Sequence, residues 1–131
     1  MSSVNWLEKL GWTTEDLQDL RFVGYSYIKQ GHYDTALKFF EALVILDPSS
    51  IYDKQTLGAI YLEMGENQKA LKHIDEALTL DPTHEETLLN RVKALFLLGY
   101  NSQAKTLATR LKNAKQEVIR NNAEALLLAY Q

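Results

Sequence analysis

The chain has 131 residues, of which 46% are hydrophobic and 24% are charged, and it contains no cysteine. This length suits one domain built around a single core. Without cysteine there is no disulfide framework, no thiolate metal site and no cysteine nucleophile, and the composition fits a reducing cytoplasm, which is the expected location. No apolar run approaches the roughly 18 residues of a membrane span, and residues 1–6 lack a signal-peptide pattern, so we expect neither membrane insertion nor export by that route.

The net charge of −3 is unevenly distributed along the chain. Residues 1–90 carry 7 basic and 15 acidic side chains, whereas residues 91–131 carry 7 basic and 2 acidic ones. A basic end attracts nucleic acid or an acidic protein. Single-strand binders also interleave aromatic rings with their basic side chains, and this sequence has no such stripe. We therefore expect the basic residues to solvate outer helix faces, and we expect no nucleic-acid partner.

The first predicted element is a short helix over residues 4–12. Its apolar residues follow helical spacing, and Gly11 provides a stop signal near its end. Trp6 and Trp12 need an apolar contact, for which two explanations remain open. They either cap the helices that follow or contact another molecule, since tryptophan is enriched at binding hot spots.

The next part of the chain repeats with a period of 34 residues. The segment 24–31, which begins and ends with glycine, recurs as 58–65 and, less closely, as 92–99. The same offset relates further positions, namely Ala36, Ala70 and Ala104, then Tyr27, Tyr61 and Leu95, and finally Leu46–Pro48 and Leu80–Pro82. One register kept over this length indicates a repeat architecture.

Apolar residues at a 3.6-residue period predict two helices in each repeat unit. Gly31, Gly65 and Gly99 fall where the first helix of each pair ends, and Thr13 or Thr14 is the expected cap of the first pair. The predicted helices are 14–30, 33–46, 51–64, 67–80, 85–98 and 101–112.

A period of 34 with glycine, tyrosine, alanine and a closing proline at fixed positions resembles the tetratricopeptide repeat. The resemblance implies an all-α fold, a right-handed α-solenoid of three helix-turn-helix repeats with an N-terminal helix and a C-terminal capping helix. The single domain over 1–131 then consists of an extension over 1–16, repeats over 17–50, 51–84 and 85–118, and the capping helix over 117–131. The third repeat departs from the pattern, because Gln116 stands where proline closes the others, so we expect the connection at 113–118 to be the least regular.

In such a solenoid the first helix of each repeat lines a concave groove. Positions 2, 5, 9 and 12 of each repeat are expected to face it. These positions hold Gln18, Arg21, Tyr25, Ile28, Tyr52, Gln55, Ala59, Leu62, Glu86, Leu89, Lys93 and Phe96. About half of these side chains are apolar, which predicts a groove that binds an apolar or amphipathic segment of another protein.

The capping helix carries apolar residues on more than one face. Caps usually have a polar outer face, so this helix either packs as a plain cap or leaves part of its apolar surface for a second partner. The candidate second interface combines both ends of the chain and consists of Trp6, Trp12, Leu126, Leu127, Leu128 and Tyr130.

Catalytic and metal-binding patterns are missing from the sequence. His32, His73 and His84 lack the spacing of metal ligands, no glycine-rich phosphate loop follows a strand, and no Gly-x-Ser-x-Gly motif occurs. We therefore expect a binding protein, not an enzyme, with no cofactor and no metal site.

Two further comparisons narrow the expected class. Repeat proteins that grip the acidic tails of heat-shock chaperones carry a clamp of lysine, asparagine and arginine, but only Arg21 keeps a cation at the corresponding positions and Glu86 would repel a carboxylate. The run from Gly31 to Pro48, the chain length and the N-terminal helical extension instead resemble the class II chaperones of bacterial type III secretion, which guard translocator or needle subunits.

This second resemblance implies a protein client, held in the groove without ATP and kept from assembling until export. In that family the needle-subunit branch also uses a small helical co-chaperone. Chain length and the short region before the first repeat favour the needle-subunit branch over the translocator branch. The alternative is a generic scaffold or adaptor module that binds a peptide or helix within a larger assembly.

Overall fold

The computed structural model describes residues 5–131, so Val4, within the predicted N-terminal helix, lies outside the described residues. Over that range the chain forms eight α-helices. They are α1 (Trp6–Leu10), α2 (Thr14–Lys29), α3 (Tyr33–Leu46), α4 (Ile51–Glu63), α5 (Asn67–Leu80), α6 (Glu85–Leu97), α7 (Asn101–Leu111) and α8 (Glu117–Ala129). The all-α repeat fold expected from the sequence is confirmed, and helices α2 to α7 lie within one residue of their expected bounds.

Side-chain caps and glycines set the helix ends. Thr13 and Asp16 form a reciprocal capping box at α2: the Asp16 amide donates to Thr13 Oγ1 at 3.3 Å, and the Thr13 amide donates to Asp16 Oδ2 at 2.7 Å. After α2, α4 and α6, respectively, Gly31, Gly65 and Gly99 have φ angles of 77°, 78° and 85°. This left-handed conformation suits glycine and ends each helix before the turn into the next one.

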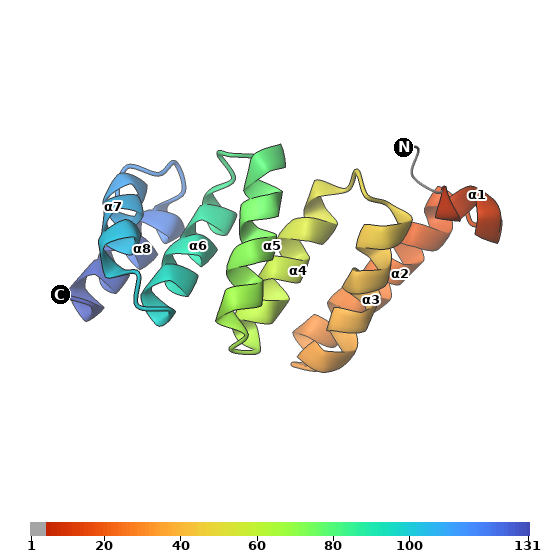
Figure 1. Cartoon of the computed structure of the whole chain (residues 1–131), viewed down its shortest axis with the longest axis horizontal. Helices are drawn as coiled ribbons and strands as arrows, with labels where there is room; N and C mark the ends of the chain where they lie inside the picture. Colours follow the sequence, from red (N-terminus) through yellow and green to blue (C-terminus); the bar gives the residue numbers. More distant parts are fainter. Residues whose placement is uncertain (1–4) are drawn as a thin grey trace.

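The helices lie side by side along the long axis of the molecule, with the two termini at opposite ends (Figure 1). Two glycines allow the helices of the first two repeats to pack closely. A Cβ atom at Gly24 would lie 2.8 Å from Cε2 of Phe40, and one at Gly58 would lie 3.2 Å from the backbone nitrogen of Ile74. A side chain at either position would therefore force neighbouring helices apart.

Two clusters of buried apolar residues hold the stack together. The first joins the first two repeats and includes Phe40, Leu43 and Ile74, which are 0% exposed, and it extends to Ala94 of α6. The second joins α6, α7 and α8 and centres on residues such as Val92. Leu71 of α5 packs against both clusters and so connects them.

The connection between α7 and α8, expected to be irregular, is fixed by side chains. The Glu85 carboxylate accepts the backbone N–H groups of Lys115 at 2.7 Å and Gln116 at 3.0 Å. These bonds lower the pKa of Glu85, with the Lys115 amide the largest cause. The Arg120 guanidinium donates to the carbonyl oxygens of Ala114 and Lys115. A carboxylate and a guanidinium thus satisfy this turn without the proline that closes the other repeats.

The last helix takes the place that the first helix of a further repeat would occupy. Helix α8 packs against both α6 and α7. At its end the ring of Tyr130 stacks on Phe96 of α6, with ring centroids 4.2 Å apart and an interplanar angle of 11°. The capping helix α8, with Tyr130 at its end, therefore covers part of α6, the first helix of repeat three. None of the helices within residues 5–131 is long and apolar enough to cross a membrane.

A candidate protein-binding groove

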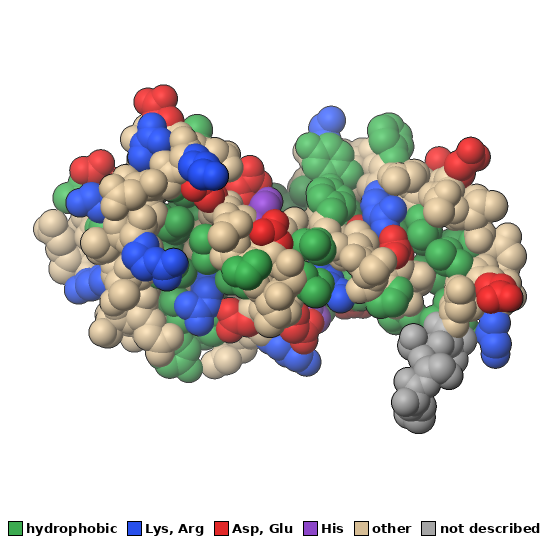
Figure 2. Space-filling view, turned by 90° about the horizontal axis from the view of Figure 1, so that it is seen from above, with side chains coloured by type: hydrophobic (Ala, Val, Ile, Leu, Met, Phe, Trp, Pro, Cys, Tyr) green, Lys and Arg blue, Asp and Glu red, His purple; other side chains and the backbone are tan. Residues whose placement is uncertain are grey.

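Three surface pockets follow one another along the face formed by α2, α4 and α6. The N-terminal pocket has a volume of about 850 Å³ and lies between α2 and α4. Its lining residues are Gln18, Asp19, Arg21, Phe22, Tyr25, Asp47, Ser50 and Tyr52. In Figure 2 the outline of the molecule is indented between the end nearest the grey residues and the opposite end, and hydrophobic side chains border the indentation.

The central pocket adjoins the first and shares Tyr25 and Tyr52 with it. Its volume is about 290 Å³, and it crosses from α2 over α4 to α6. The remaining lining residues are Ile28, Gln55, Thr56, Ala59, His84, Glu86, Thr87 and Asn90. The imidazole Nδ1 of His84 accepts the Thr87 amide at 3.3 Å, so this ring caps α6. The central pocket therefore combines aromatic and aliphatic walls with amide and carboxylate groups.

The C-terminal pocket, also of about 290 Å³, lies where α4 and α6 meet the capping helix. It is lined by Leu62, Glu63, Lys93, Leu97, Leu126 and Tyr130. Residues at the end of α8 thus form one wall of the groove.

Ten of the twelve residues expected in the groove line one of these pockets, but Leu89 and Phe96 do not. Leu89 is 5% exposed and Phe96 is 3% exposed, and both belong to the core cluster of the third repeat. The expectation that they are open groove residues is wrong, because α8 packs over α6 and Tyr130 covers the Phe96 ring. What the ten pocket residues bind remains a prediction.

Further helix positions besides 2, 5, 9 and 12 line the pockets. Phe22, Thr56 and Asn90 occupy position 6 of their repeats, Asp19 and Thr87 occupy position 3, and Glu63 and Leu97 occupy position 13. The signal was present, because position 6 lies next to position 2 on a helix with 3.6 residues per turn. Asp47 and Ser50 were missed for a different reason, since they belong to the connection between α3 and α4 and not to a helix face.

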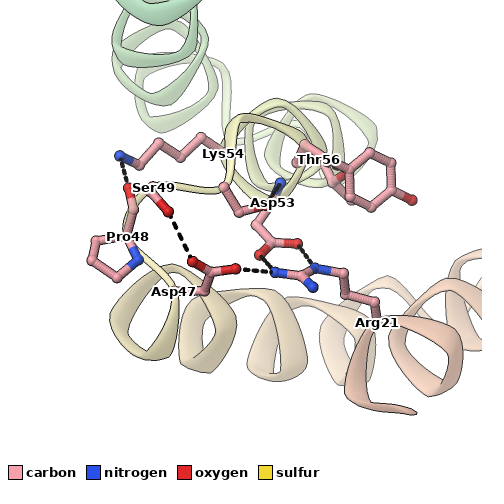
Figure 3. A network of polar contacts seen from close by, with 9 residues as sticks. Arg21, Asp47, Pro48, Ser49, Asp53, Lys54 and Thr56 are labelled. Carbon is pink, nitrogen blue, oxygen red and sulfur yellow. Dashed lines mark hydrogen bonds and ion pairs between the residues drawn. The ribbon is translucent and has the colours of Figure 1, made fainter. Parts of the chain in front are cut away.

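Arg21, which lines the N-terminal pocket as expected, forms hydrogen bonds and ion pairs within the protein (Figure 3). Its Nε donates to Asp53 Oδ1 at 2.8 Å, and its Nη2 donates to Asp53 Oδ2 at 2.7 Å and to Asp47 Oδ2 at 2.7 Å. The hydrogen bond with Asp53 is the largest cause that raises the pKa of Arg21 above its ordinary value. The side chain of Asp53 is 0% exposed, so this network ties repeat one to repeat two through a buried carboxylate.

Of the six residues of the candidate second interface, three are exposed and three pack against the core. Trp6 and Trp12 are 42% and 38% exposed, and Leu128 is 63% exposed. The other three members, Leu126, Leu127 and Tyr130, are half-buried and pack against the core of the third repeat. These three side chains act as a cap, whereas a partner for the exposed three remains a prediction. Within residues 5–131 no group of three or more histidine, aspartate or glutamate side chains is arranged to hold a metal ion.

Two segments of the chain match family models described as tetratricopeptide repeat, residues 23–50 and residues 54–84. Residues 23–50 and 54–84 are therefore tetratricopeptide repeats, and the eight stacked helices have the fold of such repeats. No curated protein matches the sequence.

Among solved structures, the fold is similar to type III secretion chaperones and also to the tetratricopeptide-repeat domain of Sgt2 from Aspergillus fumigatus, which aligns over 87% of this chain and 78% of that one with a TM-score of 0.75 and 16% identity. The type III secretion translocator chaperone SycD of Yersinia enterocolitica aligns over 98% of both chains with a TM-score of 0.81 and 19% identity. SycD in complex with a peptide of the translocator YopD aligns over 90% of this chain and 94% of that one, with a TM-score of 0.80 and 20% identity. PcrH of Pseudomonas aeruginosa, in complex with the chaperone binding region of PopD, aligns over 92% and 94%, with a TM-score of 0.77 and 24% identity.

These likenesses concern the fold. The partners named in the complexes are a peptide of the translocator YopD and the chaperone binding region of PopD, and neither is named as a needle subunit. The preference for the needle-subunit branch, drawn from chain length and from the short region before the first repeat, therefore finds no support, and neither does the small helical co-chaperone predicted with it.

Proposed function

We propose that this chain is a chaperone of a type III secretion system that holds a segment of a translocator subunit in its groove and keeps that subunit from assembling before export. The observation that carries the proposal is a groove that spans three repeats, on a fold shared with SycD and PcrH. The partners of those two proteins suggest the class of client for this one.

The groove offers the anchors that a peptide-binding surface needs. Tyr25 and Tyr52 are each 47% exposed and stand between the N-terminal and central pockets, while Ile28 and Leu62 are half-buried along the same face. Rigid aromatic and aliphatic side chains in pockets supply most of the free energy in such contacts. Amide groups such as Gln55 beside them bind the backbone of an extended segment, whose N–H and C=O groups must be satisfied.

Filling the central pocket with a large side chain tests the proposal. Ala59 lies in this pocket on α4, and an arginine there fills the space while keeping a good helix former in place. The matched control is Ala42→Arg, because Ala42 is exposed on α3, away from the three pockets. Both variants should have the circular dichroism spectrum of the unsubstituted protein.

Each protein is coexpressed with translocator subunits encoded in the same gene cluster, and the purified material is measured by light scattering after size exclusion. The unsubstituted chain and Ala42→Arg should form a complex of fixed stoichiometry with one subunit, and Ala59→Arg should lose it. A complex that survives Ala59→Arg would place the client elsewhere. If no subunit is held, the chaperone assignment fails and a generic adaptor module remains.

A further inference from the structure

The N-terminal pocket differs from the other two in its chemistry. Three of its walls are aromatic rings: Phe22 is 74% exposed, and Tyr25 and Tyr52 are each 47% exposed. Rings left open to water at this level gain free energy when a partner covers them. The electron-rich faces of such rings also attract cations. Tyr25 already shows this preference, since Lys29 Nζ lies 5.4 Å from its ring centroid.

Carboxylates outnumber cationic groups at this pocket. The Arg21 guanidinium contacts the carboxylates of Asp53 and Asp47, and the carboxylate of Asp19 is a third one, at the pocket wall. Arg21 donates three hydrogen bonds to Asp53 and Asp47, so its positive charge is paired with those two carboxylates. The carboxylate of Asp19 has neither a salt bridge nor a hydrogen bond within residues 5–131 in this structure.

The nearby lysines do not cancel this imbalance. Lys54 Nζ donates to the Pro48 carbonyl at 2.6 Å, and neither Lys54 nor Lys29 lines the pocket. In the adjoining central pocket, Glu86 adds another carboxylate, and no lysine or arginine is among the lining residues. The N-terminal half of the groove is therefore aromatic and acidic.

We propose that the N-terminal pocket binds a lysine or arginine side chain of the client segment. The ammonium or guanidinium group would lie between the Asp19 carboxylate and the Tyr52 ring, because Lys29 Nζ already lies 5.4 Å from the Tyr25 ring centroid, and its methylene stem would cover Phe22. Because Tyr25 and Tyr52 also border the central pocket, a neighbouring apolar residue of the same segment would enter that pocket. This inference rests on the proposed function, in that it assumes a peptide segment in the groove.

The test uses a random library of N-acetylated decapeptides passed over the immobilised full chain, with the bound peptides sequenced by mass spectrometry. Peptides retained by the unsubstituted chain and not by Ala59→Arg define those bound in the groove. We expect lysine or arginine to be enriched at one position of these peptides, close to an apolar residue. Aspartate and glutamate should be depleted at that position.

One enriched peptide then enters a double-mutant cycle. Replacing its basic residue by norleucine removes the charge, and Asp19→Asn removes the charge of the pocket. Each change should weaken binding about 2- to 5-fold, as for an exposed charge pair, and the second should add little to the first. Glu15→Gln is the matched control, because Glu15 is an exposed residue of α2 outside the three pockets, and it should leave affinity unchanged.

Three results would overturn the inference. Groove-bound peptides without a basic preference would refute it while leaving the proposed function in place. Equal losses in Asp19→Asn and Glu15→Gln would show that only the overall charge of α2 matters. A library with no groove-bound peptide would contradict both proposals.

Discussion

Removing the Arg21 side chain tests the energetic link between the first two repeats. In Arg21→Met the stem of the side chain is kept, but Asp53 loses both hydrogen bonds from the guanidinium. Its carboxylate is 0% exposed while Arg21 covers it, and in the variant water from the N-terminal pocket that Arg21 lines offsets part of the loss, so the cost lies toward the lower end of the range for buried pairs. Breaking a buried ion pair by deleting one partner costs about 3–5 kcal/mol of unfolding free energy. For a domain whose total stability is about 5–15 kcal/mol, this is a large fraction.

The network also predicts how substitutions combine. Asp53→Asn should cost less than Arg21→Met, because Arg21 still contacts Asp47 and is 15% exposed. The double variant should be about 0.5–3 kcal/mol more stable than the sum of the two single losses predicts, since the second substitution removes the partner that the first left unpaired.

Urea unfolding followed by circular dichroism at 222 nm measures these free energies, and the slope with urea reports how much of the chain unfolds together. A slope lower than that of the unsubstituted protein would mean that repeat one unfolds separately. Arg21→Met with a loss under about 1 kcal/mol, or single losses that simply add, would refute the reasoning, because a surface ion pair behaves in that way.

Three further changes follow from packing and charge. Gly58→Ala should destabilise by about 1–3 kcal/mol in urea unfolding, because the new Cβ meets Ile74 and helix spreading outweighs the better helix propensity of alanine; a gain in stability would contradict the packing. Phe96→Ala should lower the free energy of unfolding by about 3–5 kcal/mol and lower the melting temperature, since the ring is 3% exposed beneath Tyr130. A loss of peptide binding without a loss of stability would instead show that Phe96 is a groove residue. Glu85→Gln should be less stable than the parent at neutral pH. Because the folded-state pKa of Glu85 is lowered, its contribution is present above the unfolded pKa and lost as the pH falls through the folded pKa, so the difference between the two proteins should shrink in acid, and a difference that is constant with pH would refute this role.

The periodicity of the sequence predicted most of the fold. The 34-residue offset and the glycines at 31, 65 and 99 are local signals, and the helices they predict agree with the structure to within one residue. Groove positions could also be predicted in the first two repeats, because α2 and α4 occupy equivalent places in the stack. This regularity explains why ten of the twelve expected residues line pockets.

The failures occur where the chain leaves the repeat. Phe96 is buried because the ring of Tyr130, at the end of the capping helix, stacks on it. Arg21 is neutralised by Asp53, which is 32 residues away, and no local pattern reveals such a pair. The needle-subunit branch was inferred from chain length and from the short region before the first repeat, neither of which carries information about the chemistry of a client.

The division of the core between two clusters bears on how the molecule opens and closes. Units of a repeat protein that open separately exchange their amide hydrogens at separate rates. The N-terminal pocket belongs to the unit of repeats one and two, whereas the C-terminal pocket joins Leu62 of that unit to Tyr130 of the other. A segment that filled the whole groove would bridge both units, so the two exchange rates would fall together on binding, and the bound protein would open as one body.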